Sequence, residues 1–123
     1  MEVPDSQLNL VVLRASNLEH AATFYREIGL AFTLHAHGSG PEHYASECNG
    51  LVFELYPVSP KSSPTAGTRI GFSVKSVDDV VTRLSKLGAI VVTPPSASEW
   101  GRRAVVKDFD GHIVELITPN AIE

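Results

Sequence analysis

The sequence predicts an α+β fold made of two βαβββ modules in tandem. Three observations predict it. The 123 residues suit one domain, apolar residues make up 43% of the chain, and the succession of strand-like and helix-like patterns in the first half recurs in the second. We expect a single domain over residues 1–123, with module 1 at about 7–57, a linker at about 58–67 and module 2 at about 68–119.

The first half shows the patterns of a strand, a helix and three more strands. In "LEHAATFYREIG" apolar residues recur at helical spacing, Ser16 or Asn17 can cap the helix, and Gly29 can end it. "LAFTLHAH" alternates at strand period, and Asn49-Gly50 predicts a tight hairpin between two further strands. The expected elements are a helix at 18–28 and strands at 8–14, 30–37, 43–48 and 51–56.

The second half repeats this order after the polar linker "VSPKSSPTAG". Ser76 is a suitable N-cap, and Gly88 is a suitable stop for the helix between them. Prolines are expected to end the strand "AIVVTPP", and the turn "FDG" joins the last two strands. The expected elements are a helix at 77–87 and strands at 68–74, 89–95, 102–108 and 112–118.

The strand pattern also predicts which side chains face away from the helices, into a concave surface that we call the cup. The two-residue Asn-Gly turn pairs Ala45 with Glu54, so Glu54 lies in the cup. In the second half, a four-residue loop would pair Ala104 with Glu115. This register places Arg102 in the cup and Arg103 on the opposite face.

Three histidines gather in "HAHGSGPEHY", and three readings of them remain open. His35 and His37 lie on one face of a strand, roughly 7 Å apart by strand geometry, and His43 shares that side. They can bind a transition metal together with Glu47 or Glu54. Alternatively, His37 or His43 contacts a ligand, or all three are polar residues at the end of a hairpin.

Composition limits the possible partners and the compartment. The net charge is −4 with both signs interspersed, so no nucleic-acid or anionic membrane footprint is expected. No apolar run approaches the roughly 18 residues of a membrane span, and "MEVPDSQLNL" lacks the features of a signal peptide. The single cysteine, Cys48, excludes an internal disulfide. We expect a cytoplasmic protein.

The repeat, the helix "NLEHAATFYREIGL" and the strand pair around "DFDGHIVEL" resemble the vicinal oxygen chelate superfamily. This superfamily includes glyoxalase I, fosfomycin-resistance thiol transferases, extradiol ring-cleaving dioxygenases and bleomycin-binding proteins. The resemblance covers essentially the whole chain. It implies the glyoxalase/bleomycin-resistance/dioxygenase-like fold, a cup for a small molecule, and a homodimer that completes the cup.

The resemblance also implies where a metal would bind. In metal-dependent members, the first strand of each module supplies a histidine or glutamine and the last strand a glutamate. Glu54 and Glu115 match the last-strand positions, whereas Leu10 and Arg69 occupy the first-strand positions. Leu10 has no donor atom, and Arg69 keeps its proton and its charge. The usual metal site is therefore expected to be degenerate, with Arg69 paired to Glu115 and no cofactor bound.

These inferences lead to one functional prediction and one alternative. The chain is predicted to bind a small organic molecule in the cup, with Glu54 as a candidate base. The residues expected to contact the ligand are His37, His43, Tyr56, Arg69, Trp100, Arg102 and Glu115. The alternative is a divalent-metal-dependent lyase or dioxygenase that uses Glu54, Glu115, His37 and His43 as ligands.

Overall fold

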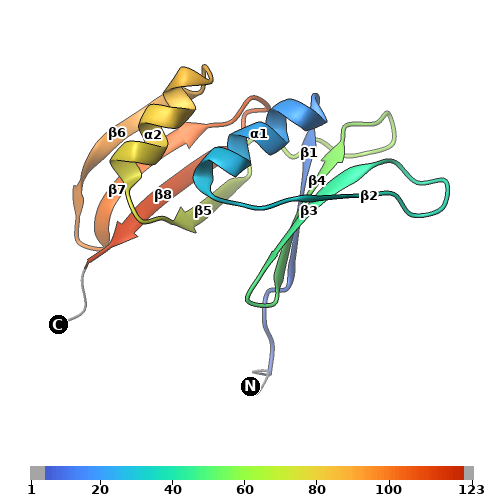
Figure 1. The fold of residues 1–123 in the computed structure, drawn as a ribbon, viewed down its shortest axis with the longest axis horizontal. Helices are drawn as coiled ribbons and strands as arrows, with labels where there is room; N and C mark the ends of the chain where they lie inside the picture. The colour runs from blue at the N-terminus through green and yellow to red at the C-terminus, as the bar shows by residue number, and fades with distance from the viewer. Residues whose placement is uncertain (1–4, 121–123) are drawn as a thin grey trace.

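The computed structural model describes residues 5–120 and contains two four-stranded sheets, each with one helix (Figure 1). Sheet 1 has the strand order β1-β4-β3-β2, and sheet 2 has the equivalent order β5-β8-β7-β6. The predicted tandem repeat is therefore confirmed. The elements are β1 Leu10–Ala15, α1 Leu18–Ile28, β2 Thr33–His35, β3 His43–Cys48, β4 Leu51–Pro57, β5 Arg69–Ser73, α2 Val77–Lys86, β6 Ile90–Ser98, β7 Gly101–Lys107 and β8 Ile113–Pro119.

Both helices begin at side-chain caps that the sequence indicates. The Asn17 side chain accepts a hydrogen bond from the backbone N–H of His20 at 3.0 Å, and Ser76 accepts one from Asp79 at 3.2 Å. These bonds satisfy N–H groups that have no partner within the first turn of a helix. Gly29 ends α1 with a φ of 123°, a conformation that favours glycine.

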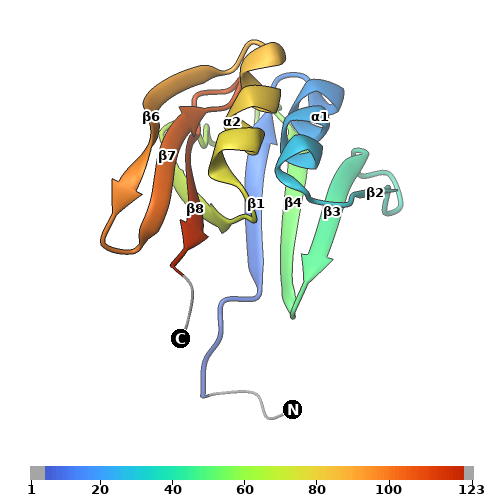
Figure 2. The same cartoon turned by 60° about the vertical axis from the view of Figure 1, so that its left-hand side comes forward.

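The two helices lie side by side and share one core with both sheets (Figures 1 and 2). The Arg83 guanidinium of α2 donates to the Glu27 carbonyl of α1 at 3.1 Å. The Tyr25 ring of α1 lies 5.0 Å from the Phe53 ring of β4 and 5.9 Å from the Phe72 ring of β5. Aromatic contacts thus join the two modules into one core, and the opposite face of each sheet is left for the cup.

The register of the first hairpin is as predicted, whereas that of the second is shifted by one residue. Ala45 lies opposite Glu54 as expected. In the second module Val105, not Ala104, lies opposite Glu115. Because side chains alternate between faces, a one-residue shift exchanges the two faces of the strand. The prediction that Arg102 lies in the cup is therefore wrong, and Arg103 takes that place.

The shift arises in the loop between β7 and β8. Lys107 pairs with Ile113, so five residues rather than four form the loop. The Asp108 side chain accepts hydrogen bonds from the backbone N–H groups of Asp110 at 3.0 Å and His112 at 2.9 Å. The bond from Asp110 forms an Asx turn, and both bonds stabilise the five-residue loop.

Two strands differ in length from their predictions. Only Thr33–His35 of the predicted 30–37 strand pairs as β2. β6 continues through Pro94 and Pro95 to Ser98, although the prolines were expected to end it. β6 is an edge strand with irregular register, where proline loses no necessary ladder bond. Among residues 5–120, no helix is both long and apolar enough to cross a membrane.

Candidate functional site

An open pocket of about 500 Å³ lies over the concave face of sheet 1. It contains the three clustered histidines and two carboxylates, and all of its lining residues come from module 1. The structure therefore brings His37, His43 and Glu54 together, as the strand pattern predicts. The lining residues are Ala31, Thr33, His35, His37, His43, Ala45, Glu47, Val52 and Glu54.

His43 lines this pocket and stacks on Tyr56, which lies beside the pocket and is not one of its lining residues. The side chain of His43 is only 2% exposed, and its ring stacks on Tyr56 with centroids 4.2 Å apart and planes 7° from parallel. The Arg14 guanidinium carbon lies 5.2 Å from the Tyr56 ring centroid. Planar groups from β1, β4 and β3 thus lie in succession on sheet 1, with the His43 ring almost fully covered by its neighbours. Planar aromatic and cationic groups interact favourably with flat, polarisable ligands.

One nitrogen of His43 is buried without a hydrogen-bond partner among the described residues. This atom, Nε2, lies 3.6 Å from Oε2 of Glu54, too far for a hydrogen bond. Nδ1 lies 3.3 Å from the Pro41 carbonyl oxygen. A buried polar atom without a partner costs free energy. A polar group of a ligand that bonds to Nε2 and to the Glu54 carboxylate would remove this cost.

The other two histidines adjoin His43. The ring centroids are 5.9 Å apart for His35 and His37, 5.8 Å for His35 and His43, and 5.2 Å for His37 and His43. His35 and His37 are exposed at the mouth of the pocket. Across residues 5–120, no three His, Cys, Asp or Glu side chains are grouped so that they could hold a metal ion.

The concave face of sheet 2 carries a different polar group, a carboxylate held by two arginines. Nε of Arg103 donates to Oε1 of Glu115 at 2.7 Å, and Nη2 of Arg69 donates to Oε2 at 3.1 Å. The Arg103 bond lowers the pKa of Glu115, partial burial opposes it, and the Arg69 bond lowers the pKa further. The predicted Arg69–Glu115 pair is confirmed, and Glu115 is an ionised partner of both arginines at neutral pH.

A family model described as "Glyoxalase/Bleomycin resistance protein/Dioxygenase superfamily" matches residues 7–116 of the chain. The chain belongs to this superfamily. The match spans both modules, including the strands that carry the histidine pocket and the arginine-bound glutamate.

Several known proteins are similar to this superfamily member along nearly its whole length. An uncharacterized protein of Mycolicibacterium smegmatis is 28% identical, covering 94% of this chain and 96% of its own. The antibiotic-binding protein TnmS3 from Streptomyces sp. CB03234 is 26% identical with a TM-score of 0.71, covering 97% and 100%. A glyoxalase-related enzyme from Fulvimarina pelagi is 24% identical with a TM-score of 0.72, covering 91% and 87%.

On the first strands of this superfamily member, the residues that lie opposite the two glutamates carry no metal-ligating side chain. Val12 lies directly opposite Glu54, and Gly71 lies directly opposite Glu115. Leu10 occurs two residues before Val12 on the same face of β1. None of Val12, Gly71 and Leu10 has a side-chain donor atom, and Glu115 is already bound by two cations.

Of two other predicted contact residues, Arg102 lies on the helix side of sheet 2, and Trp100 lies at a turn. Arg102 forms a two-bond ion pair with Asp78 of α2, at 2.6 Å and 3.0 Å. This bond to Arg102 lowers the pKa of Asp78. Trp100 is 64% exposed at the turn between β6 and β7.

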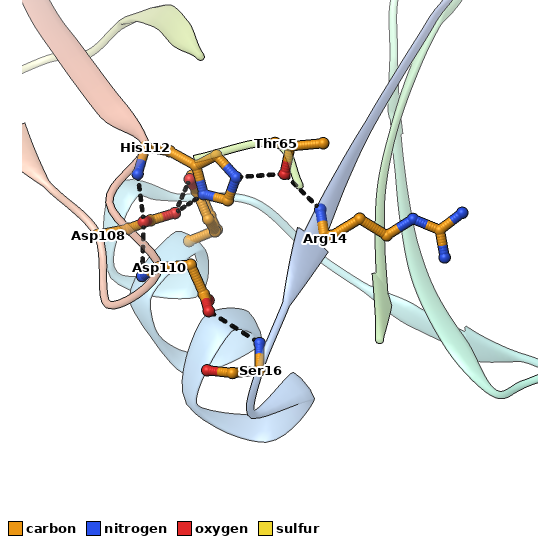
Figure 3. Close-up of polar contacts among 7 residues, drawn as sticks. Arg14, Ser16, Thr65, Asp108, Asp110 and His112 are labelled. Carbon is orange, nitrogen blue, oxygen red and sulfur yellow. Dashed lines mark hydrogen bonds and ion pairs between the residues drawn. The ribbon is translucent and has the colours of Figure 1, made fainter. Parts of the chain in front are cut away.

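Sequence reasoning missed a buried polar network between the modules (Figure 3). The Tyr25 hydroxyl donates to Oδ2 of Asp108 at 2.6 Å, and the same oxygen lies 2.6 Å from Nδ1 of His112. Nε2 of His112 lies 2.6 Å from the Thr65 hydroxyl, which accepts the backbone N–H of Arg14 at 2.9 Å. The network joins α1, the β7–β8 loop, the linker and β1.

Ionisation in this network follows from burial and hydrogen bonding. Burial alone raises the pKa of Asp108, but the bonds from His112 and Tyr25 outweigh it, so the pKa lies below its usual value. Burial and the Asp108 charge hold the pKa of Tyr25 well above its usual value. Asp108 is thus a carboxylate and Tyr25 a phenol. The motif "DFDGH" indicates the Asp108 and His112 part of the network. Thr65 lies in a polar linker whose sequence has no pattern that predicts its contacts.

Proposed function

We propose that the chain binds a small, flat organic molecule in the pocket over sheet 1, without the metal that metal-dependent members use. The stack of His43 on Tyr56 is the observation that carries this proposal. The pocket volume of about 500 Å³ lies in the range typical of sites for drug-sized ligands. The similarity to the antibiotic-binding protein TnmS3 supports the same class of function.

Glu54 has a specific part in this proposal. Its carboxylate lies 3.6 Å from the unpartnered Nε2 of His43, so a ligand hydroxyl or amide can bridge the two groups. An ionised carboxylate accepts a hydrogen bond, and neutral histidine can donate or accept one. Glu54 therefore anchors the polar edge of the ligand. It is also the candidate base for any proton transfer in the pocket.

Completion of the cup by a second copy of the chain is part of the proposal. Glu47 and Glu54 line the pocket of sheet 1, whereas Arg69 and Arg103 outnumber Glu115 on sheet 2. Pairing sheet 1 of one copy with sheet 2 of the other joins opposite charges twice under two-fold symmetry. Light scattering should give a dimer mass. We also propose a cytoplasmic location, consistent with a single free cysteine.

Acridone, a neutral and planar three-ring compound, tests the binding site by fluorescence titration. Replacing His43 by leucine removes one aromatic stacking partner, which contributes about 1–1.5 kcal/mol, so the Kd for acridone should rise about tenfold. Tyr56→Leu should have a similar effect. His20→Leu is the matched control, because His20 lies on α1 next to Phe109, away from the pocket. Equal affinities in all four proteins would contradict the proposal.

A second candidate function is a divalent-metal-dependent lyase or dioxygenase. The unpartnered Nε2 of His43, with His37 and Glu54 beside it, is the observation in its favour. Glu115 lines a separate pocket with no residue of module 1, so within one chain it does not join this group. Metal analysis and titration with Ni²⁺, Zn²⁺ and Mn²⁺ distinguish the candidates. A tightly held stoichiometric metal that is lost in His43→Ala would favour the enzyme over metal-free binding.

A further inference from the structure

The concave face of sheet 2 carries two guanidinium groups on a single carboxylate. Arg103 and Arg69 each donate one bond to Glu115, one to each oxygen. Two positive charges against one negative charge leave this group with a net charge of about +1 at neutral pH. Each guanidinium has several N–H donors, and within residues 5–120 each uses one for a side-chain hydrogen bond.

We propose that Arg69 and Arg103 form an anion subsite that binds a carboxylate group of an organic acid. The planar fork of a guanidinium matches the two oxygens of a carboxylate. Glu115 holds both forks in place, so little side-chain entropy remains to be lost when an acid binds. The bound acid brings the charge of the group to about zero.

Space for such a group lies beside Gly71. A pocket of about 120 Å³ is lined by Gly71, Phe72, Ser73, Glu115 and Ile117. Neither arginine lines this pocket, but both donate to Glu115, which does. A Cβ atom at position 71 would touch the backbone oxygen and the Cβ of Glu115, at 3.7 Å and 3.8 Å. These are ordinary contact distances, so a methyl group would fit at position 71 and would occupy part of this space. The volume suits a carboxylate group, with the rest of the acid extending over the cup.

The exposure of the two arginines suits a site that solutes can reach. The side chain of Arg69 is 56% exposed and that of Arg103 is 26% exposed. Arg69 occupies the position at which the resemblance to metal-dependent members implies a metal ligand. The Arg69 guanidinium is a fixed cation beside Glu115, and it can hold a ligand oxygen by hydrogen bonds.

Benzoate tests the subsite, with benzamide as its neutral counterpart, in titrations followed by backbone amide NMR shifts. Benzoate should shift the amides of Arg69, Gly71 and Arg103, whereas benzamide should leave them in place. Arg103→Gln and Arg69→Gln should each weaken benzoate binding about tenfold, since each removes a charge-assisted hydrogen bond. Arg103→Lys keeps the charge and the fold but loses the fork, and it should weaken binding severalfold.

Arg102→Gln is the matched control, because Arg102 is the neighbouring residue on the opposite face and pairs with Asp78. It should bind benzoate as the unmodified chain does. Equal binding of benzoate and benzamide, or benzoate binding unchanged in Arg103→Gln and Arg103→Lys, would overturn the subsite.

This inference rests on the proposed function only in treating the concave faces as ligand surfaces. The two tests use different probes and substitute different residues. If acridone binds at sheet 1 and benzoate does not bind at sheet 2, the anion subsite alone fails. If benzoate binds and acridone does not, only the proposal of a flat ligand on the His43–Tyr56 stack fails.

Discussion

Replacing Asp108 by asparagine tests whether the buried network holds the two modules together. The Asp108 carboxylate accepts four hydrogen bonds, two at each oxygen. An asparagine oxygen can keep the two backbone bonds from Asp110 and His112. Its NH₂ group would replace the oxygen that binds the Tyr25 hydroxyl and Nδ1 of His112, so both of these partners would have to reverse their roles as donors.

The expected loss follows from the two bonds that change. Charge-assisted hydrogen bonds contribute about 1.5–3 kcal/mol each, and neutral ones about 1 kcal/mol. In Asp108→Asn, the two charge-assisted bonds with Tyr25 and His112 become two strained neutral bonds. This exchange should lower the free energy of unfolding by about 2 kcal/mol. Asp108 is 7% exposed, so solvent compensates little. With a urea m-value of about 2 kcal/mol/M, the denaturation midpoint should fall by about 1 M.

Urea denaturation followed by circular dichroism measures this change. Asp110→Asn is the matched control in the same loop. The Asp110 carboxylate accepts one exposed bond from the Ser16 backbone N–H at 2.8 Å, which an asparagine oxygen can also accept. Its midpoint should stay within about 0.2 M of the unmodified chain. The reasoning is refuted if Asp108→Asn stays within the same limit, or if both variants lose the same amount.

Three more predictions concern stability. The pKa of Asp108 is lowered in the folded state. Its contribution to the free energy of unfolding is therefore present above the unfolded pKa of about 3.9 and is lost as the pH falls through the folded pKa. The urea midpoint should fall at acid pH, and it should fall less in Asp108→Asn. Tyr25→Phe removes one donor to this carboxylate and should cost about 1–2 kcal/mol in the same assay. Gly101→Ala should cost about 3 kcal/mol or more, because the residue has a φ of 133° and its Cβ would clash with the Thr118 carbonyl oxygen. Gly67→Ala is the control, because Gly67 has a φ of 88° and no atom near its Cβ; it should cost only about 1 kcal/mol. Equal urea midpoints for the two alanine variants would contradict the predicted clash at Gly101.

The fold was predictable because its signals are local and occur twice. The helix caps Asn17 and Ser76 and the hairpin at Asn49-Gly50 are each specified by a few adjacent residues. Strand lengths were less predictable, since β2 and β6 are edge strands. Their pairing depends on neighbouring strands and on bulges rather than on their own composition.

The candidate site was predictable in part. The alternation of side chains along the strands predicts that His37, His43 and Glu54 share one face. The Asn-Gly turn sets the register of the hairpin that contains His43 and Glu54. The stacking of His43 on Tyr56 and the isolation of its Nε2 depend on side-chain packing, which strand period does not specify. The Thr65 contact to His112 depends on the path of a polar linker with no periodic pattern.

The choice between two adjacent arginines shows how a small backbone feature determines chemistry. The Asp108 side chain closes a five-residue loop, and this shifts β7 by one residue from the four-residue loop that the sequence indicates. With four residues, Arg102 would have faced the cup. With a five-residue loop, Arg103 and Arg69 both form ion pairs with Glu115, and Arg102 forms an ion pair with Asp78 of α2. The length of the loop that this buried carboxylate closes therefore sets which guanidinium lies on the concave face. Any variant of Asp108 that changes this loop should alter benzoate binding at Arg103 as well as stability.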